Sequence, residues 1–253
     1  MIIDVSVPLA ERSEAAIGRA LARSRACISG DHMFNSIRAP LRACAACVLS
    51  CASATAVAKP IAFANGTTVM AEYGAGTMLE GQAFYAPAYW LSIGGGYARF
   101  DSDLRDVDRE IAYLRVNYLA KRWNLPSAQA NIFVWGGLGS AAGNTFDGSR
   151  LARNVGAQFD YETRRVYASV KSDLWESSEF SQRVDTVQLG LAPYAHDYST
   201  LATWFVIQGR DYTGQIRRGV EWAALVRLFK GGAWVEAGLT ADGKPQVMAM
   251  FNF

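Results

Sequence analysis

The sequence predicts an all-β fold: an antiparallel transmembrane β-barrel of about twelve strands, with ten as the alternative count. Three observations predict it. After residue 65, runs rich in Val, Tyr, Phe, Trp and Thr alternate with short turns. Most runs are about 9–14 residues long, close to the ~9–11 that a tilted strand needs to cross a bilayer. Within the runs, apolar and polar residues alternate, which places them on opposite faces of a strand.

The strand-like runs follow one another with regular punctuation. We expect strands at residues 66–75, 77–86, 88–101, 109–122, 129–140, 152–161, 164–175, 183–193, 199–210, 216–229, 232–240 and 245–253. Alternate connections are short, such as Ala86–Ala88 and Asn124–Ser127, whereas the others are longer, such as Asp101–Asp108 and Ser140–Leu151. Short turns on one rim and longer loops on the other are typical of transmembrane barrels. An even count places both ends of the barrel on the rim of short turns, which we expect to face the periplasm.

The last nine residues, Pro245 to Phe253, form the final run. Val247, Ala249, Phe251 and Phe253 fall on one side of this strand. With its alternating apolar residues and aromatic last residue, the run resembles the C-terminal strand of Gram-negative outer-membrane β-barrel proteins. The resemblance is to that class and not to one family. It implies a protein of the outer membrane that contacts outer-membrane lipid and is recognised by the outer-membrane assembly machinery through this strand.

The segment before the barrel has the order of a secretory signal peptide. Met33 begins a short segment with Arg38 and Arg42, and the apolar stretch Ala43–Ala58 follows. Two small-x-small cleavage sites end it, at Ala56-Val57-Ala58 and Ala62-Phe63-Ala64.

This order predicts three parts of the chain. Residues 1–32 are a spurious or dispensable extension, residues 33–64 are the signal peptide, and residues 65–253 are the barrel. The alternative is a basic cytoplasmic helix followed by a small hairpin rich in Ala and Cys.

Charge and cysteine content exclude other classes. The first 58 residues hold six of the 25 basic and four of the 23 acidic residues, which leaves 19 of each in the remainder. No basic stripe remains there, so nucleic acid is not expected as a partner. All four cysteines lie between Cys27 and Cys51, without the second pair of ligands that a zinc site requires. No catalytic residues and no cofactor are predicted.

The faces of the predicted strands divide the side chains into two sets. An apolar face inward would give a soluble periplasmic ligand-binding barrel, whereas the strand length and aromatic rim favour the apolar face outward, toward lipid. The charged residues then line the lumen: Arg115, Lys121, Lys171, Asp173, Arg217, Glu221, Arg227 and Glu236. An aromatic girdle is expected at the periplasmic rim: Tyr85, Tyr89, Trp123, Tyr161, Tyr194, Tyr198, Phe229 and Phe253.

Mixed inward charges predict a lining held together by ion pairs, and hence a narrow pore for small polar or ionic solutes or a closed structural barrel. An outer-membrane hydrolase is an alternative, although after the predicted signal peptide the sequence offers one histidine, His196, as a catalytic base. A further alternative is contact with copper or silver through Met70, Met248 and Met250, whose thioethers suit soft metals. The transported solute and the oligomeric state are not determined by the sequence.

Overall fold

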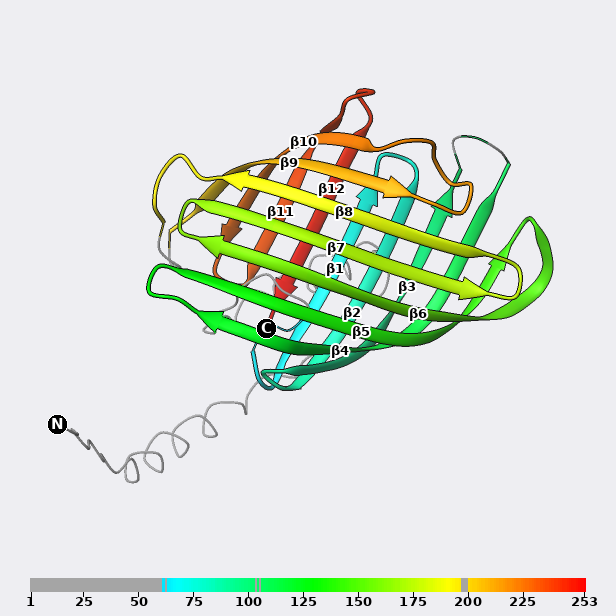
Figure 1. Cartoon of the computed structure of the whole chain (residues 1–253), viewed down its shortest axis with the longest axis horizontal. Coiled ribbons are helices and arrows are strands. Elements are labelled where there is room, and N and C mark those ends of the chain that lie inside the picture. Colours follow the sequence, from blue (N-terminus) through cyan, green and yellow to red (C-terminus); the bar gives the residue numbers. More distant parts are fainter. Residues whose placement is uncertain (1–60, 62, 103, 105, 197–199) are drawn as a thin grey trace, which may run out of the picture. The chain divides into compact units, whose positions relative to one another are not determined.

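The computed structural model describes residues 61, 63–102, 104, 106–196 and 200–253. They form a closed antiparallel barrel (Figure 1). Its twelve strands are β1 (Gly66–Gly74), β2 (Met78–Ala88), β3 (Leu91–Asp101), β4 (Asp108–Asn124), β5 (Ala128–Gly143), β6 (Phe146–Thr163), β7 (Val166–Ser177), β8 (Ser181–Leu191), β9 (Ala202–Tyr212), β10 (Glu221–Lys230), β11 (Ala233–Thr240) and β12 (Pro245–Asn252). The predicted fold class and strand count are confirmed. The predicted extension and signal peptide, residues 1–64, fall outside the described residues, apart from Ile61, Phe63 and Ala64.

The first and last strands close the barrel. β1 pairs with β12 along its length, and Met70 lies opposite Met250. The backbone of Thr67 exchanges two hydrogen bonds with that of Phe253, at 2.6 and 2.9 Å. We call the end of the barrel where β1 begins and β12 ends the terminal rim, and the opposite end the loop rim. Closure pairs every strand on both sides, which a barrel in lipid requires.

The two faces of the wall differ in polarity, as the alternation predicts. Leu114, Leu189 and Ile207 point outward and are more than half exposed. Arg115, Gln208 and Glu236, which lie on the opposite faces of their strands, are almost completely buried. A soluble ligand-binding barrel would have the reverse arrangement. The chain is therefore a transmembrane β-barrel. Among the described residues, no helix is long and apolar enough to cross a membrane.

The strands differ in length around the barrel. β6 has 18 residues, whereas β11 and β12 have 8 each. At the loop rim the outer surface of β3 and β4 is charged: Arg99 forms ion pairs with Asp101 and Asp108 at 3.3 and 2.7 Å. Charged side chains are costly in lipid, so these residues mark the edge of the membrane on the loop-rim side. The ends of β3 and β4 extend beyond this edge.

Two expected connections differ from the structure. The predicted loop Ser140–Leu151 is wrong, because β5 and β6 continue as a hairpin as far as Gly143 and Phe146. The predicted strand at 216–229 begins later, at Glu221, and the preceding residues form a loop. In this loop Gly214, Gln215 and Gly219 adopt positive φ, which an extended strand does not allow.

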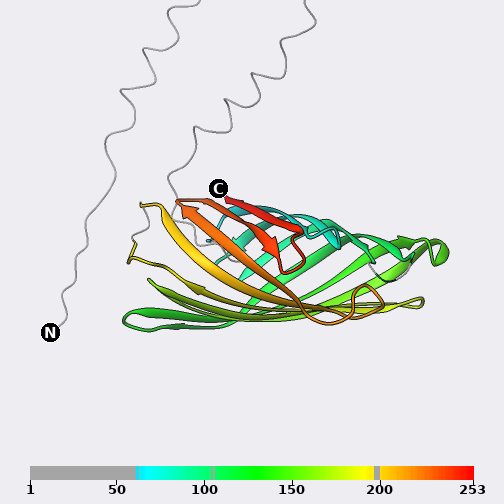
Figure 2. The ribbon, with the colours of Figure 1, turned by 90° about the horizontal axis from the view of Figure 1, so that it is seen from above.

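Apolar clusters fill much of the lumen near its ends. At the loop rim, Val107, Phe180 and Ile216 come from three different connections and pack with inward strand residues such as Trp175 and Tyr212. Two smaller clusters lie nearer the terminal rim. Figure 2 shows β12 and β1–β3 facing β5–β8 across the space that these side chains occupy.

Candidate functional site

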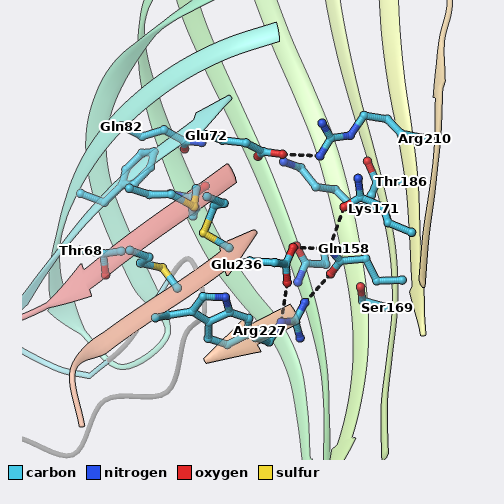
Figure 3. Close-up of a pocket in the computed structure, with 18 of the residues that line it drawn as sticks. Thr68, Glu72, Gln82, Gln158, Ser169, Lys171, Thr186, Arg210, Arg227 and Glu236 are labelled. Carbon is cyan, nitrogen blue, oxygen red and sulfur yellow. Dashed lines mark hydrogen bonds and ion pairs between the residues drawn. The ribbon is translucent and has the colours of Figure 1, made fainter. Parts of the chain in front are cut away.

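A polar cavity lies between these clusters, in the middle of the lumen (Figure 3). Its volume is about 140 Å³. Four cations and two carboxylates line it: Arg115, Lys171, Arg210, Arg227, Glu72 and Glu236. It is the candidate site, because a transmembrane barrel acts on solutes through the side chains of its lumen.

Asp173 does not itself line the cavity, but it is the centre of a network that holds two lining residues, Arg115 and Trp135. One of its carboxylate oxygens accepts hydrogen bonds from Trp135 Nε1 at 3.0 Å and Asn154 Nδ2 at 2.6 Å. Its other oxygen pairs with Arg115 at 3.1 Å. The Arg115 guanidinium also lies 4.8 Å from the centre of the Tyr113 ring. Three donors and an aromatic contact offset the cost of burying this ion pair.

A second ion pair joins Glu72 on β1 to Arg210 on β9. Strands β10, β11 and β12 separate these two along the wall, so the pair crosses the lumen. Figure 3 shows the two side chains reaching toward each other across the cavity. Arg210 also donates to the Tyr212 hydroxyl at 3.2 Å. The pair therefore lies across the loop-rim side of the cavity.

Arg227 closes the cavity on the terminal-rim side. Its guanidinium lies 4.4 Å from the centre of the Tyr167 ring and 4.3 Å from that of Trp234. It pairs with Glu236 at 2.6 Å and donates to Gln188 at 2.9 Å. The side chain of Arg227 is 3% exposed, so these contacts, in place of water, compensate almost all of its positive charge.

A second cavity, of about 50 Å³, lies beyond Arg227 toward the terminal rim. Arg227, Tyr167 and Trp234 line both cavities and therefore form the partition between them. His196 lines the smaller cavity, with its ring centre 5.3 Å from that of Trp204.

The other charged residues expected in the lumen occupy different positions. Arg217 and Glu221 pair at 3.3 Å near the loop rim and do not line the central cavity. Lys171 lines the cavity, and its Nζ lies 5.8 Å from the Trp135 ring centre. Lys121 differs from the expectation and is exposed. A bulge between Leu119 and Lys121 reverses the alternation there, because one extra residue shifts all later side chains to the other face.

The bulge places Arg122 inside in place of Lys121. Arg122 donates to Asn131 at 2.7 Å, and Asn131 in turn donates to Asp160 at 2.6 Å. The alternation of the sequence cannot reveal that Arg122 and not Lys121 points inward, because no particular type of residue marks the bulge.

The residues expected in the aromatic girdle lie near the terminal rim. Tyr85, Tyr89, Trp123, Tyr194 and Phe253 are exposed. Tyr161 is partly buried, and Tyr198 falls outside the described residues. Phe229 differs from the expectation: it lines the smaller cavity and packs edge-on against Trp234, at 6.1 Å between ring centres.

Further exposed aromatic side chains were not predicted as part of a girdle. Tyr73 and Trp222 lie within two residues of strand ends at the loop rim. Aromatic residues at both rims match the two interfaces of a membrane.

The three methionines proposed as soft ligands, Met70, Met248 and Met250, all line the central cavity. Four aromatic lining residues, Phe84, Trp135, Tyr167 and Trp234, were not predicted. In the sequence, only the alternation of inward and outward positions along each strand could have indicated these residues, because each stands next to outward apolar residues such as Val134 and Val235.

A twelve-stranded antiparallel barrel with an apolar exterior and a polar lumen is the architecture of outer-membrane proteins. The protein is an outer-membrane β-barrel.

No protein-family model and no curated protein matches the sequence. Among solved structures, the chain is similar to a KdgM porin in complex with disordered oligogalacturonate, with 8% identity and a TM-score of 0.41 over 74% of this chain and 98% of that one. It is also similar to OmpT, an outer membrane protein of Vibrio cholerae, with 10% identity and a TM-score of 0.26 over 74% of this chain and 96% of that one. At these values the similarities carry no argument about solute or activity.

Proposed function

We propose that the protein is a narrow, gated pore for small polar or ionic solutes. The observation that carries this proposal is the pair of lumen cavities separated by three stacked side chains, with Arg227 between the rings of Tyr167 and Trp234. A barrel with a purely structural role can fill its interior with packed side chains. This lumen instead keeps a cavity lined by charged and amide groups.

The two ends of the passage differ in how they are closed. At the terminal-rim side the partition is Arg227 between the rings of Tyr167 and Trp234, and a movement of Arg227 out of this stack would join the two cavities. At the loop rim the cluster includes Ile216, which is completely buried although it lies in the loop between β9 and β10. Gly214 and Gly219, on either side of Ile216, have φ of 70° and 72°. A loop that carries its own apolar plug is an element that can open without disturbing the wall.

The test is conductance of the refolded protein in a planar bilayer. The informative variant is Arg227→Ala/Glu236→Gln, which removes the arginine of the partition and leaves no unpaired buried carboxylate. We expect a small current from the parent protein and a several-fold larger current from this variant. The control is Arg150→Gln/Glu179→Gln, which removes an ion pair that lines neither cavity and lies outside the loop between β9 and β10.

Two results would contradict the proposal. If the parent and the variant both fold, shown by heat-modifiable migration on gels, and neither conducts, the barrel has a closed structural role. If the control raises the current as much as the variant does, Arg227 is not the partition.

A further inference from the structure

Three methionines form one patch on the wall of the central cavity. Met70 lies directly opposite Met250 in the pairing of β1 with β12. Met248 precedes Met250 by two residues and therefore shares its inward face. All three line the same cavity. The fourth methionine of the described residues, Met78, lies in the apolar cluster at the loop rim.

The pairing brings the three thioethers within reach of one ion. Directly opposite residues of antiparallel strands have Cβ atoms about 4.5–5.5 Å apart, and diagonal neighbours about 7–8 Å. Met70 and Met250 are an opposite pair, and Met70 and Met248 are diagonal. A methionine side chain has three rotatable bonds, so its sulfur can move by more than these separations require.

Acidic and aromatic side chains surround the patch. Met248 lies between Glu72 on β1 and Glu236 on β11, directly opposite it on each side. Met250 lies between Met70 and Trp234 in the same manner. Each carboxylate already has an arginine partner, Arg210 or Arg227. The pairs leave a near-neutral surface, which suits a monovalent cation better than a divalent one, because less charge must be compensated.

The donor set distinguishes between classes of metal. Among the described residues, no three His, Cys, Asp or Glu side chains are grouped as a metal site. The lining of the cavity includes neither histidine nor cysteine. Hard cations such as Ca²⁺ and Mg²⁺ require several oxygen ligands. Thioether sulfur binds soft metals, of which Cu(I) and Ag(I) are monovalent.

We propose that Met70, Met248 and Met250 form a binding site for one Cu(I) or Ag(I) ion in the lumen. The thioethers supply the bonds, and the Glu72–Arg210 and Glu236–Arg227 ion pairs beside them leave the surface of the patch near neutral. The site does not depend on the proposed pore function, because a barrel with a closed lumen can hold the ion as well.

The test is competition for Cu(I) between the refolded full chain and the chromophoric chelator bicinchoninate, without oxygen. Cysteine binds Cu(I) strongly, so every protein in the comparison carries Cys27→Ser, Cys44→Ser, Cys47→Ser and Cys51→Ser. The test variant is Met248→Leu/Met250→Leu, and the matched control is Met78→Leu. Leucine and methionine are close in volume, so both variants are expected to fold.

We expect one Cu(I) per barrel in the parent and in the control. In the double variant, affinity falls by about tenfold or more, since loss of direct ligands costs at least as much as loss of their supporting groups. Equal binding by parent and double variant overturns the proposal, as does absence of binding by the parent.

X-ray absorption of the Cu(I)-loaded parent protein gives a second measurement that needs no variant. Sulfur atoms in the first coordination shell support the site, and a shell of nitrogen and oxygen alone overturns it. Ag(I) in place of Cu(I), titrated in chloride-free buffer, gives an air-stable repeat of the same comparison.

Discussion

Glu72 and Arg210 form an ion pair across the lumen, from strands that are not neighbours in the wall. The side chains are 13% and 5% exposed, respectively. Two other inward ion pairs join strands that are closer along the wall, Arg115 with Asp173 on β4 and β7, and Arg227 with Glu236 on adjacent strands. The Glu72–Arg210 pair is therefore a brace across the lumen between two distant strands of the wall.

Breaking this brace from one side costs more than removing it completely. We expect Glu72→Gln and Arg210→Gln each to lower the free energy of unfolding by about 3 kcal/mol, because each leaves one buried charge without its partner. In the double variant the loss is smaller than the sum of the two. Urea unfolding in lipid vesicles measures all three proteins. Strict additivity would show that the two side chains act independently.

The outward face predicts a cost that depends on membrane depth. Ile207 lies in the middle of β9 and is 61% exposed, whereas Trp222 is the second residue of β10, at the loop rim. Ile207→Arg should cost about 2–4 kcal/mol, because it places a charge in the hydrocarbon. Trp222→Arg should cost only about 0–1 kcal/mol for the charge itself. Equal costs in vesicles would mean that the membrane is centred elsewhere on the barrel.

Gly156 provides a test of how the Asp173 network is held. A Cβ atom at Gly156 would lie 2.4 Å from the ring of Trp135, which donates to Asp173. Gly156→Ala must push this ring aside, and we expect a loss of about 1–3 kcal/mol in unfolding free energy.

The matched control for Gly156→Ala is Gly81→Ala. A Cβ at Gly81 meets nothing within 4 Å. This substitution should be neutral or stabilise by about 0.4–1 kcal/mol, because alanine restricts the unfolded chain. A loss at Gly81 equal to that at Gly156 would attribute the effect to the strand and not to Trp135.

Selectivity should follow the charges that line the cavity. Arg115, Arg210 and Arg227 are each paired with a carboxylate, and Lys171 adds one further positive charge, so the open pore should prefer anions weakly. Lys171→Gln removes this charge and should remove the preference, seen as a shift of the reversal potential in a salt gradient. Lys230→Gln makes the same change at an exposed position at the terminal rim and serves as the control. Equal shifts for both would place the selecting charge outside the cavity.

Much of the fold was predictable because it depends on local alternation. Alternation along the strand places Leu114 and Arg115 on opposite faces, and strand length together with the aromatic rim indicates that the apolar face is toward lipid. The number of strands was predictable because a turn separates each strand-like run from the next. The face of each side chain and the number of strands depend on residues that are close together in the chain, so both can be predicted from the sequence.

The exceptions come from backbone geometry that leaves no sequence pattern. The bulge after Leu119 exchanges Lys121 for Arg122 on the inward face. The positive φ of Gln215 is part of the turn that carries Ile216 into the lumen, where a strand was expected.

The sequence by itself determined the barrel and the face of most side chains, because both follow from alternation along one strand. Only the tertiary structure decided which inward residues meet between strands that are not neighbours. Glu72 reaches Arg210 over 138 positions of sequence, whereas the approach of Met70 to Met250 could be expected from closure of the first strand on the last. Partners across a lumen are set by register and closure, and these depend on all twelve strands at once.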